Sequence, residues 1–402
     1  MKTFRSASAC FFVALFGLAL QVPLPIGAQP FIYLTEVPDY SWHAGCFGTA
    51  TGNLAGFWDR HGLSNVYAGT IDGGVAPLSD SGRTGIRSLW ASQAGLDGRP
   101  SNKPGHIDDY YFSYEYTGAD PYVTAGRVEH TPDCIGDFIG LSQNKWTNLA
   151  SECRGNIDAF SFVFWDKTGN RRSNYYTTNY NTTNTATYVP DIGSGLKEWM
   201  RWRGYDADVF TQLTDFNPER STSAGFTYAD VKREIDAGYP VLCFLQPAGE
   251  FNRTVAGVPN VNPEIHGVMI YGYFTDTASG YDKGVIIRTS WGTGETFVNW
   301  GAASWLGLFP VRGVIGFHPK PTIRTFTHSG GNLTIAWEGP STYLYDDSLG
   351  TTSGPLQKYL VQRATNLSSP DWKTVAGPIT EQSATIPQPT DSFAFYRVVI
   401  QP

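Results

Sequence analysis

The most regular hydrophobic pattern in the chain lies between residues 42 and 60, where apolar positions recur at intervals of three and four. These positions are Phe47, Ala50, Leu54, Phe57 and Trp58. The spacing predicts a helix with a buried face, beginning at the Gly45-Cys46 pair and ending near Gly62. A cysteine at a helix start is chemically special, because unpaired backbone N–H groups and the helix dipole favour the reactive thiolate. The alternative is a structural cysteine, since free cysteines are among the most buried residues.

Further helices and strands are expected along the next 260 or so positions, up to residue 317. Helical spacing predicts helices over residues 84–94, 137–146, 195–203 and 227–238, the last opened by a sequence that resembles a capping box and stopped by Gly238. Apolar or β-branched runs predict strands over residues 31–38, 160–165, 241–245, 267–274, 284–291 and 314–317. This mixture indicates an α+β domain.

The pattern changes near Pro319, where short alternating runs replace the longer elements. These runs cover residues 333–337, 359–363 and 396–400, and clusters of Gly, Ser, Pro and Asn separate them. Short strands at that spacing are typical of a small all-β sandwich. We therefore expect a first domain over residues 29–319 and a sandwich without a catalytic constellation over residues 320–402.

The first 28 residues have the pattern of an export signal peptide. Lys2 and Arg5 precede the apolar run Ala9–Leu20, and small residues end the segment at Ala28. We expect cleavage there and a mature protein that is secreted or periplasmic. No later apolar run approaches the 18 residues of a membrane-spanning helix, so no membrane span is expected.

Composition narrows the function classes further. The chain has 402 residues, of which 41% are hydrophobic and 16% are charged, as in a globular protein of two or three domains. The formal net charge is −7 and no Lys/Arg-rich run stands out, so nucleic acid is not an expected partner.

The cysteines predict one disulfide and one free thiol near a helix start. Export permits disulfides, and Cys134 and Cys153 are the expected pair because both lie in polar, loop-like sequence. Cys243 lies in the buried run 241–245 and is expected to be an inert core thiol. Cys46 then remains free. No C-x-x-C or H-E-x-x-H spacing occurs, so no metal is expected, and chemistry at a cysteine thiol needs no organic cofactor.

A cysteine nucleophile needs a base, and histidine matches that task near neutral pH. His266 is set apart by its context, because it begins an apolar run over residues 266–273 and is followed by the small Gly267. A strand would fix its backbone while the ring projects from the end of the sheet. The alternative is a histidine that is merely hydrogen-bonded at a strand terminus.

Four short blocks together resemble the papain-like cysteine peptidases, and most closely their bacterial C39-like branch. The blocks are Gly45-Cys46 opening a long helix, the helix-Gly-Tyr-Pro-strand segment 229–245, His266-Gly267 leading a strand, and Ser290-Trp291-Gly292. The resemblance covers residues 36–317 and implies a helix carrying cysteine packed on an antiparallel sheet carrying histidine. It also implies hydrolysis of peptide bonds in a peptide or protein substrate, with Cys46 as nucleophile and His266 as its base. The C-terminal segment resembles fibronectin-like β modules, which implies a spacer or an attachment to a cell surface or polymer.

Two positions depart from the family pattern. Thr289 stands where the family has Asn or Asp to orient the histidine, and its hydroxyl is expected to be a weak orienter. The upstream Gln that helps to hold the oxyanion is missing, so Trp42 or His43 is expected to donate an N–H instead. Two alternatives therefore stand beside peptide hydrolysis: a catalytically silent papain-like domain that binds peptide or cell-wall polymer, and acyl transfer by the same thiol.

Overall fold

The computed structural model describes residues 31–40, 46–64, 66, 75–79, 135, 139, 163–165, 171–174, 192–215, 225–245, 253–255, 258–260, 266–292, 294–308, 310–391 and 393–401. These ranges, with their gaps, are the described part of the chain. The signal peptide, the helix expected over residues 84–94 and nearly all of that over 137–146 lie outside them.

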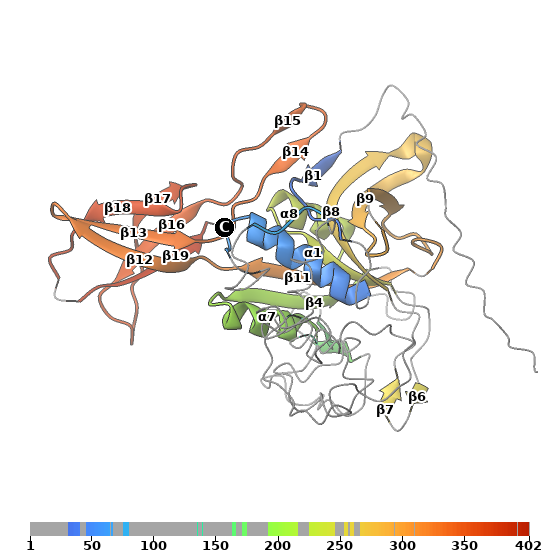
Figure 1. Cartoon of the computed structure of the whole chain (residues 1–402), viewed down its shortest axis with the longest axis horizontal. Helices are drawn as coiled ribbons and strands as arrows, with labels where there is room; N and C mark the ends of the chain where they lie inside the picture. Colours follow the sequence, from blue (N-terminus) through green and yellow to red (C-terminus); the bar gives the residue numbers. More distant parts are fainter. Residues whose placement is uncertain are drawn as a thin grey trace, which may run out of the picture.

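The part of the chain before Pro319 is an α+β structure built on one large sheet, to which two later strands, β14 and β15, are added (Figure 1). Its main path is β15 (Thr351–Thr352), β14 (Leu344–Asp346), β1 (Ile32–Leu34), β8 (His266–Asp276), β5 (Val241–Leu245), β11 (Val311–Pro319), β4 (Ala207–Leu213), β2 (Val163–Trp165) and β3 (Arg171–Asn174). In addition, β9 (Tyr281–Arg288) pairs with β8, and β10 (Thr296–Asn299) pairs with β9. A short separate pair joins β6 (Arg253–Val255) to β7 (Val258–Asn260). All of these pairings are antiparallel except that of β2 with β4.

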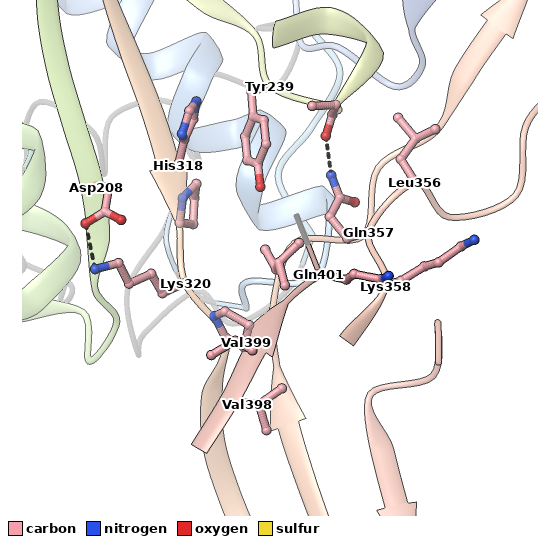
Figure 2. Close-up of a pocket in the computed structure, with 14 residues that line it drawn as sticks. Asp208, Tyr239, His318, Lys320, Leu356, Gln357, Lys358, Val398, Val399 and Gln401 are labelled. Carbon is pink, nitrogen blue, oxygen red and sulfur yellow. Dashed lines mark hydrogen bonds and ion pairs between the residues drawn. The ribbon is translucent and has the colours of Figure 1, made fainter. Parts of the chain in front are cut away.

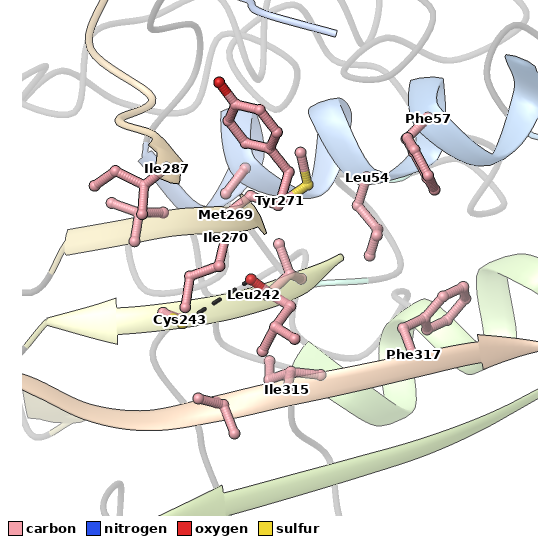
Figure 3. Close-up of a cluster of buried hydrophobic side chains, with 14 of the residues drawn as sticks. Leu54, Phe57, Leu242, Cys243, Met269, Ile270, Tyr271, Ile287, Ile315 and Phe317 are labelled. Carbon is pink, nitrogen blue, oxygen red and sulfur yellow. Dashed lines mark hydrogen bonds between the residues drawn. The ribbon is translucent and has the colours of Figure 1, made fainter. Parts of the chain in front are cut away.

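Three α-helices are described: α1 (Cys46–Arg60), α7 (Ile192–Trp202) and α8 (Tyr228–Asp236). A 3₁₀ turn, η2 (Thr277–Ser279), links β8 to β9. Helix α1 packs across β8 and β5, and Figure 3 shows its Leu54 and Phe57 above the apolar side chains of the sheet. Because every residue of β5 and the first nine of β8 are buried, both faces of these central strands are covered. No helix in the described part of the chain is long and apolar enough to cross a membrane.

Local sequence signals account for several of these elements. The helix expected from Cys46 is observed over 15 residues, and the expected capping box is present, with Thr227 and Asp230 bonded to each other's backbone N–H groups. The strand expected over residues 284–291 is observed with different bounds, because β9 begins at Tyr281 and ends at Arg288. Ser290 has a left-handed backbone, with φ of +64°, which ends the extended conformation before Trp291.

The C-terminal part contains two three-stranded sheets that enclose a second core. One sheet has the order β12 (Thr322–Ser329), β13 (Asn332–Glu338) and β18 (Ser383–Pro387), and the other has β17 (Lys373–Ile379), β16 (Tyr359–Ala364) and β19 (Phe395–Ile400). Alternate residues of β13 point inward, and Ile335 and Trp337 pack with Tyr359 and Val361 of the facing sheet. This alternation is the pattern that short sandwich strands require.

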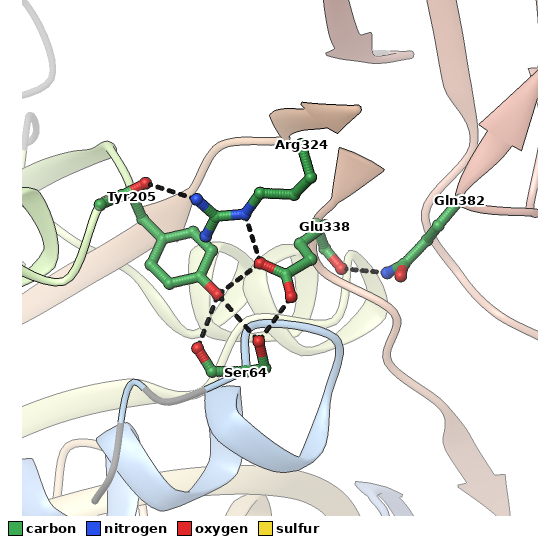
Figure 4. Close-up of polar contacts among 7 residues, drawn as sticks. Ser64, Tyr205, Arg324, Glu338 and Gln382 are labelled. Carbon is green, nitrogen blue, oxygen red and sulfur yellow. Dashed lines mark hydrogen bonds and ion pairs between the residues drawn. The ribbon is translucent and has the colours of Figure 1, made fainter. Parts of the chain in front are cut away.

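The C-terminal part is more closely joined to the first sheet than a simple linker would make it. Its hairpin β14–β15 adds to that sheet, because β14 pairs with β1 from Ile32 opposite Asp346 to Leu34 opposite Leu344. A polar cluster forms a second contact between the two parts (Figure 4). In it, Glu338 accepts hydrogen bonds from Ser64, Tyr205 and Arg324. The donor–acceptor distances are 2.5, 2.7 and 2.6 Å, respectively.

Candidate active site

Helix α1 is buried almost along its whole length, which fixes the position of its first residue. All of its residues from Phe47 to Asp59 are buried. Two of its polar side chains make buried hydrogen bonds: Thr51 donates to the carbonyl of Phe47 at 2.9 Å, and Asn53 accepts from the backbone N–H of Tyr40 at 2.9 Å. A buried helix tied to the preceding segment in this way is a rigid support for a reactive side chain.

The thiol of Cys46 lies beside Gly267, the second residue of β8. Cys46 is half-buried, and its thiol takes a hydrogen bond from the backbone N–H of Gly267. Burial raises the pKa of the thiol, while the N–H groups of Gly267, Phe47 and Cys46 itself partly oppose this rise because they stabilise the thiolate. Glycine is needed at position 267, since a Cβ there would lie 2.7 Å from the Phe47 ring. The close contact of α1 with β8 therefore places Cys46 at Gly267, the residue that follows His266 in the chain.

The imidazole of His266 is held in one orientation and one tautomer. Its Nε2 lies 2.6 Å from the carbonyl oxygen of Thr289, and its side chain belongs to a residue that is only 3% exposed. A carbonyl group only accepts hydrogen bonds, so Nε2 carries the hydrogen and Nδ1 of the neutral ring keeps a lone pair. Burial lowers the pKa of His266 to about 4, and the Thr289 carbonyl partly opposes this shift. The ring is therefore a neutral base at pH 7.

Thr289 contacts the histidine through a different atom from the one expected. The sequence suggested that its hydroxyl orients the ring, but that hydroxyl accepts a hydrogen bond from the backbone N–H of Trp291 at 3.3 Å. The backbone carbonyl of Thr289 takes the orienting role instead. The left-handed backbone of Ser290 turns the chain directly after this carbonyl.

Trp291 covers the histidine, and sequence reasoning did not assign it this role. Its indole ring stacks on the His266 imidazole, with 3.9 Å between the ring centroids and 23° between the planes. Trp291 is itself 46% exposed, so it forms part of the surface above the site. The sequence did contain a signal for this role, because Trp291 belongs to the Ser290-Trp291-Gly292 block that carries part of the family resemblance.

Other residues named from the sequence have separate outcomes. Trp42 and His43, the expected oxyanion donors, lie outside the described residues, and so does the expected Cys134–Cys153 disulfide. Cys243 is a free cysteine in the core, as expected, and burial raises the pKa of its thiol well above the usual value. It therefore offers no second reactive thiol.

A cavity of about 730 Å³ lies elsewhere, where the two parts of the chain meet (Figure 2). Two polar side chains of its wall have close partners, since His318 Nε2 lies 2.6 Å from Glu234 Oε2 and Lys320 Nζ lies 2.6 Å from Asp208 Oδ1. The ring of Tyr239 in its wall packs on Trp58 with 5.7 Å between centroids. Trp58 is three or more turns along α1 from Cys46, about 18 Å at 1.5 Å per residue. The cavity is thus separate from the Cys46–His266 site.

Two further observations concern ligands and relatives. Within the described ranges, no three His, Cys, Asp or Glu side chains are grouped closely enough to hold a metal ion. Comparison of the chain with models of protein families, with curated proteins and with solved structures gives no match.

Proposed function

We propose that the protein is an exported peptidase that hydrolyses peptide bonds with Cys46 as nucleophile and His266 as general base. One observation carries the proposal: a neutral imidazole donates Nε2–H to a fixed carbonyl, which leaves Nδ1 basic, and the next residue, Gly267, bonds the thiol at the start of a buried helix. The arrangement of a cysteine-bearing helix on an antiparallel sheet that carries histidine supports a papain-like fold as part of the same proposal.

In the acylation step, the Cys46 sulfur attacks the substrate carbonyl carbon and its proton passes to Nδ1 of His266. Both groups begin neutral, because burial raises the pKa of the thiol and lowers that of the imidazole. The proton is therefore transferred during the attack, as general base catalysis requires, instead of being lost beforehand. Helix N-termini commonly supply N–H donors to the negative oxygen of a tetrahedral intermediate, and the start of α1 is the proposed place for that oxygen.

In the following steps, the imidazolium returns its proton to the leaving amine nitrogen, the C–N bond breaks and a thioester remains on Cys46. Water then attacks the thioester while Nδ1 takes its proton, and the acid product leaves as the thiol is restored. The carbonyl of Thr289 keeps the ring in the required tautomer through both half-reactions. Stacked Trp291 restricts water at this hydrogen bond, which strengthens it.

The test is hydrolysis of fluorescently labelled casein by the mature full-length chain. Cys46→Ala should abolish the activity, and His266→Ala should reduce it by orders of magnitude because the base is removed. His318→Ala is the matched control, since this histidine lies at the separate cavity and should not matter. A wild-type rate equal to that of Cys46→Ala would overturn the proposal and leave a silent binding domain. An added amine acceptor distinguishes acyl transfer, because it would trap the acyl group as a conjugate.

A further inference from the structure

One arginine joins three chain segments that surround the candidate site. Arg288 ends β9 and directly precedes Thr289. Its Nη2 donates to the carbonyl of Val37 at 3.1 Å, and its Nη1 lies 3.4 Å from Asp39 Oδ2. The same Nη1 lies 3.4 Å from the carbonyl of Gly294, in the segment after Trp291. The guanidinium also lies over the Tyr271 ring, 4.5 Å from its centroid.

Asp39 completes this contact from the segment that leads to Cys46. Its Oδ2 accepts the backbone N–H of Gly294 at 2.5 Å, in addition to facing Arg288. The side chains of Arg288 and Asp39 are only 13% and 14% exposed. Opposite charges that are shielded from water attract each other more strongly than exposed ones, so this ion pair acts as a clamp between the two segments.

We propose that Arg288, held by Asp39, is the positioning residue that keeps the Thr289 carbonyl on His266; this inference rests on the proposed function. The atom that orients the imidazole is the backbone carbonyl oxygen of Thr289 and not a side-chain atom. Its position therefore depends on how the neighbouring residues hold the backbone. The next residue, Ser290, has a left-handed φ of +64°, which a non-glycine residue adopts only when its surroundings hold it. Arg288 fixes this turn from one side, and the Asp39–Gly294 bond fixes it from the other.

The chain offers a matched control for the clamp. Arg324 also lies 4.5 Å from the centroid of a tyrosine ring, that of Tyr205, and pairs with a carboxylate, Glu338, at 2.6 Å. It belongs to the contact with the C-terminal sheets and touches neither Thr289 nor the segment before Cys46. Arg288→Lys and Arg324→Lys are therefore the same chemical change in similar settings, and only the first affects the clamp.

The experiment measures the rate at which iodoacetamide alkylates Cys46 in the mature full-length chain, with the site identified by peptide mass spectrometry. At pH 6.5 we expect Arg288→Lys to slow alkylation by about 10- to 100-fold, toward the rate of His266→Ala, since a displacement of about 1 Å has effects of that size. At pH 9.5 hydroxide can deprotonate the thiol without help from His266, so the differences should shrink. Loss of structure alone would expose Cys46 and speed alkylation at both pH values.

The outcomes separate the two proposals. If His266→Ala is alkylated as fast as wild type at pH 6.5, the proposed function fails. If His266→Ala is slow but Arg288→Lys matches Arg324→Lys, the clamp is overturned and the proposed function stands. If Arg288→Lys does not fold, the alkylation rate of Asp39→Asn tests the clamp instead. The asparagine amide oxygen can still accept the N–H of Gly294, so only the charge facing Arg288 is lost. Alkylation of Asp39→Asn as fast as that of Arg324→Lys would also overturn the clamp.

Discussion

Replacement of Gly238 by alanine tests how firmly the C-terminal part is attached to the first sheet. Gly238 follows α8 with a left-handed φ of +90°, and a Cβ there would overlap Thr342 Oγ1 and Gln357 Nε2. Both partners are buried and belong to the C-terminal part. The amide of Gln357 donates to the carbonyl of Ala237 at 2.8 Å and accepts the backbone N–H of Thr342 at 2.8 Å. Alanine at position 238 must therefore displace a satisfied hydrogen-bond network.

The size of the effect follows from comparison with Gly280→Ala. Gly280 has a nearly equal φ of +85°, but no atom lies within 4 Å of the place that a Cβ would take, so its substitution costs only the left-handed backbone, about 1 kcal/mol. Gly238→Ala adds overpacking of about 1–3 kcal/mol and about 1 kcal/mol for a disturbed buried hydrogen bond. The free energy of unfolding should thus fall by about 2–4 kcal/mol more for Gly238→Ala than for Gly280→Ala.

Urea unfolding followed by tryptophan fluorescence measures this difference directly. Equal destabilisation by the two substitutions, within about 0.5 kcal/mol, would refute the contact between α8 and the C-terminal segment.

Three further predictions concern the site and the junction. Gly267→Ala should lower casein hydrolysis at least tenfold, because its Cβ displaces Phe47 beside Cys46, whereas Gly292→Ala, with nothing within 4 Å, should preserve it. Burial lowers the pKa of His61 to about 4, so stability that is present above about pH 6.5 should be lost as pH falls toward 4, by up to about 3 kcal/mol. Urea unfolding of wild type and His61→Phe at pH 7.5 and pH 5 checks this. If the free energy of unfolding falls equally between these pH values in both proteins, the prediction is wrong. Burial raises the pKa of Glu338, but hydrogen bonds from its three donors lower that pKa overall, so its contribution to stability should be present above the ordinary carboxyl pKa and vanish as pH falls. In urea unfolding, Glu338→Gln should lower the free energy of unfolding by about 1–3 kcal/mol at pH 7 and by little at pH 3. A loss that does not depend on pH would contradict the charge-assisted bonds.

Local patterns were sufficient to predict several parts of the fold. The period of α1, the capping box at Thr227 and the apolar run of β5 are each encoded within a few neighbouring residues. Strand β4 was missed because its alternating Asp208 and Gln212 lack the apolar signal of a buried strand. The addition of β14 to β1 was missed because pairing between distant segments leaves no local pattern.

The candidate site was only partly predictable for a similar reason. Residue type singled out Cys46 and His266, but the orienting group is a backbone carbonyl, and every residue has one. Its direction depends on the left-handed turn at Ser290, a conformation that serine does not signal. The partners of Arg288 come from segments far apart in the chain, so no spacing rule could reveal them.

The most direct test of the account is the protonation state of His266, measured by NMR of histidine labelled with ¹⁵N while the pH is lowered from 8 to 3. The account predicts a neutral ring with hydrogen on Nε2 and a lone pair on Nδ1, and a titration midpoint near the lowered pKa of about 4. Alkylation of Cys46 should shift the Nδ1 resonance, since the thiol is the expected proton donor to that atom. A ring that carries its hydrogen on Nδ1, or an Nδ1 signal that ignores alkylation of Cys46, would contradict the central claim.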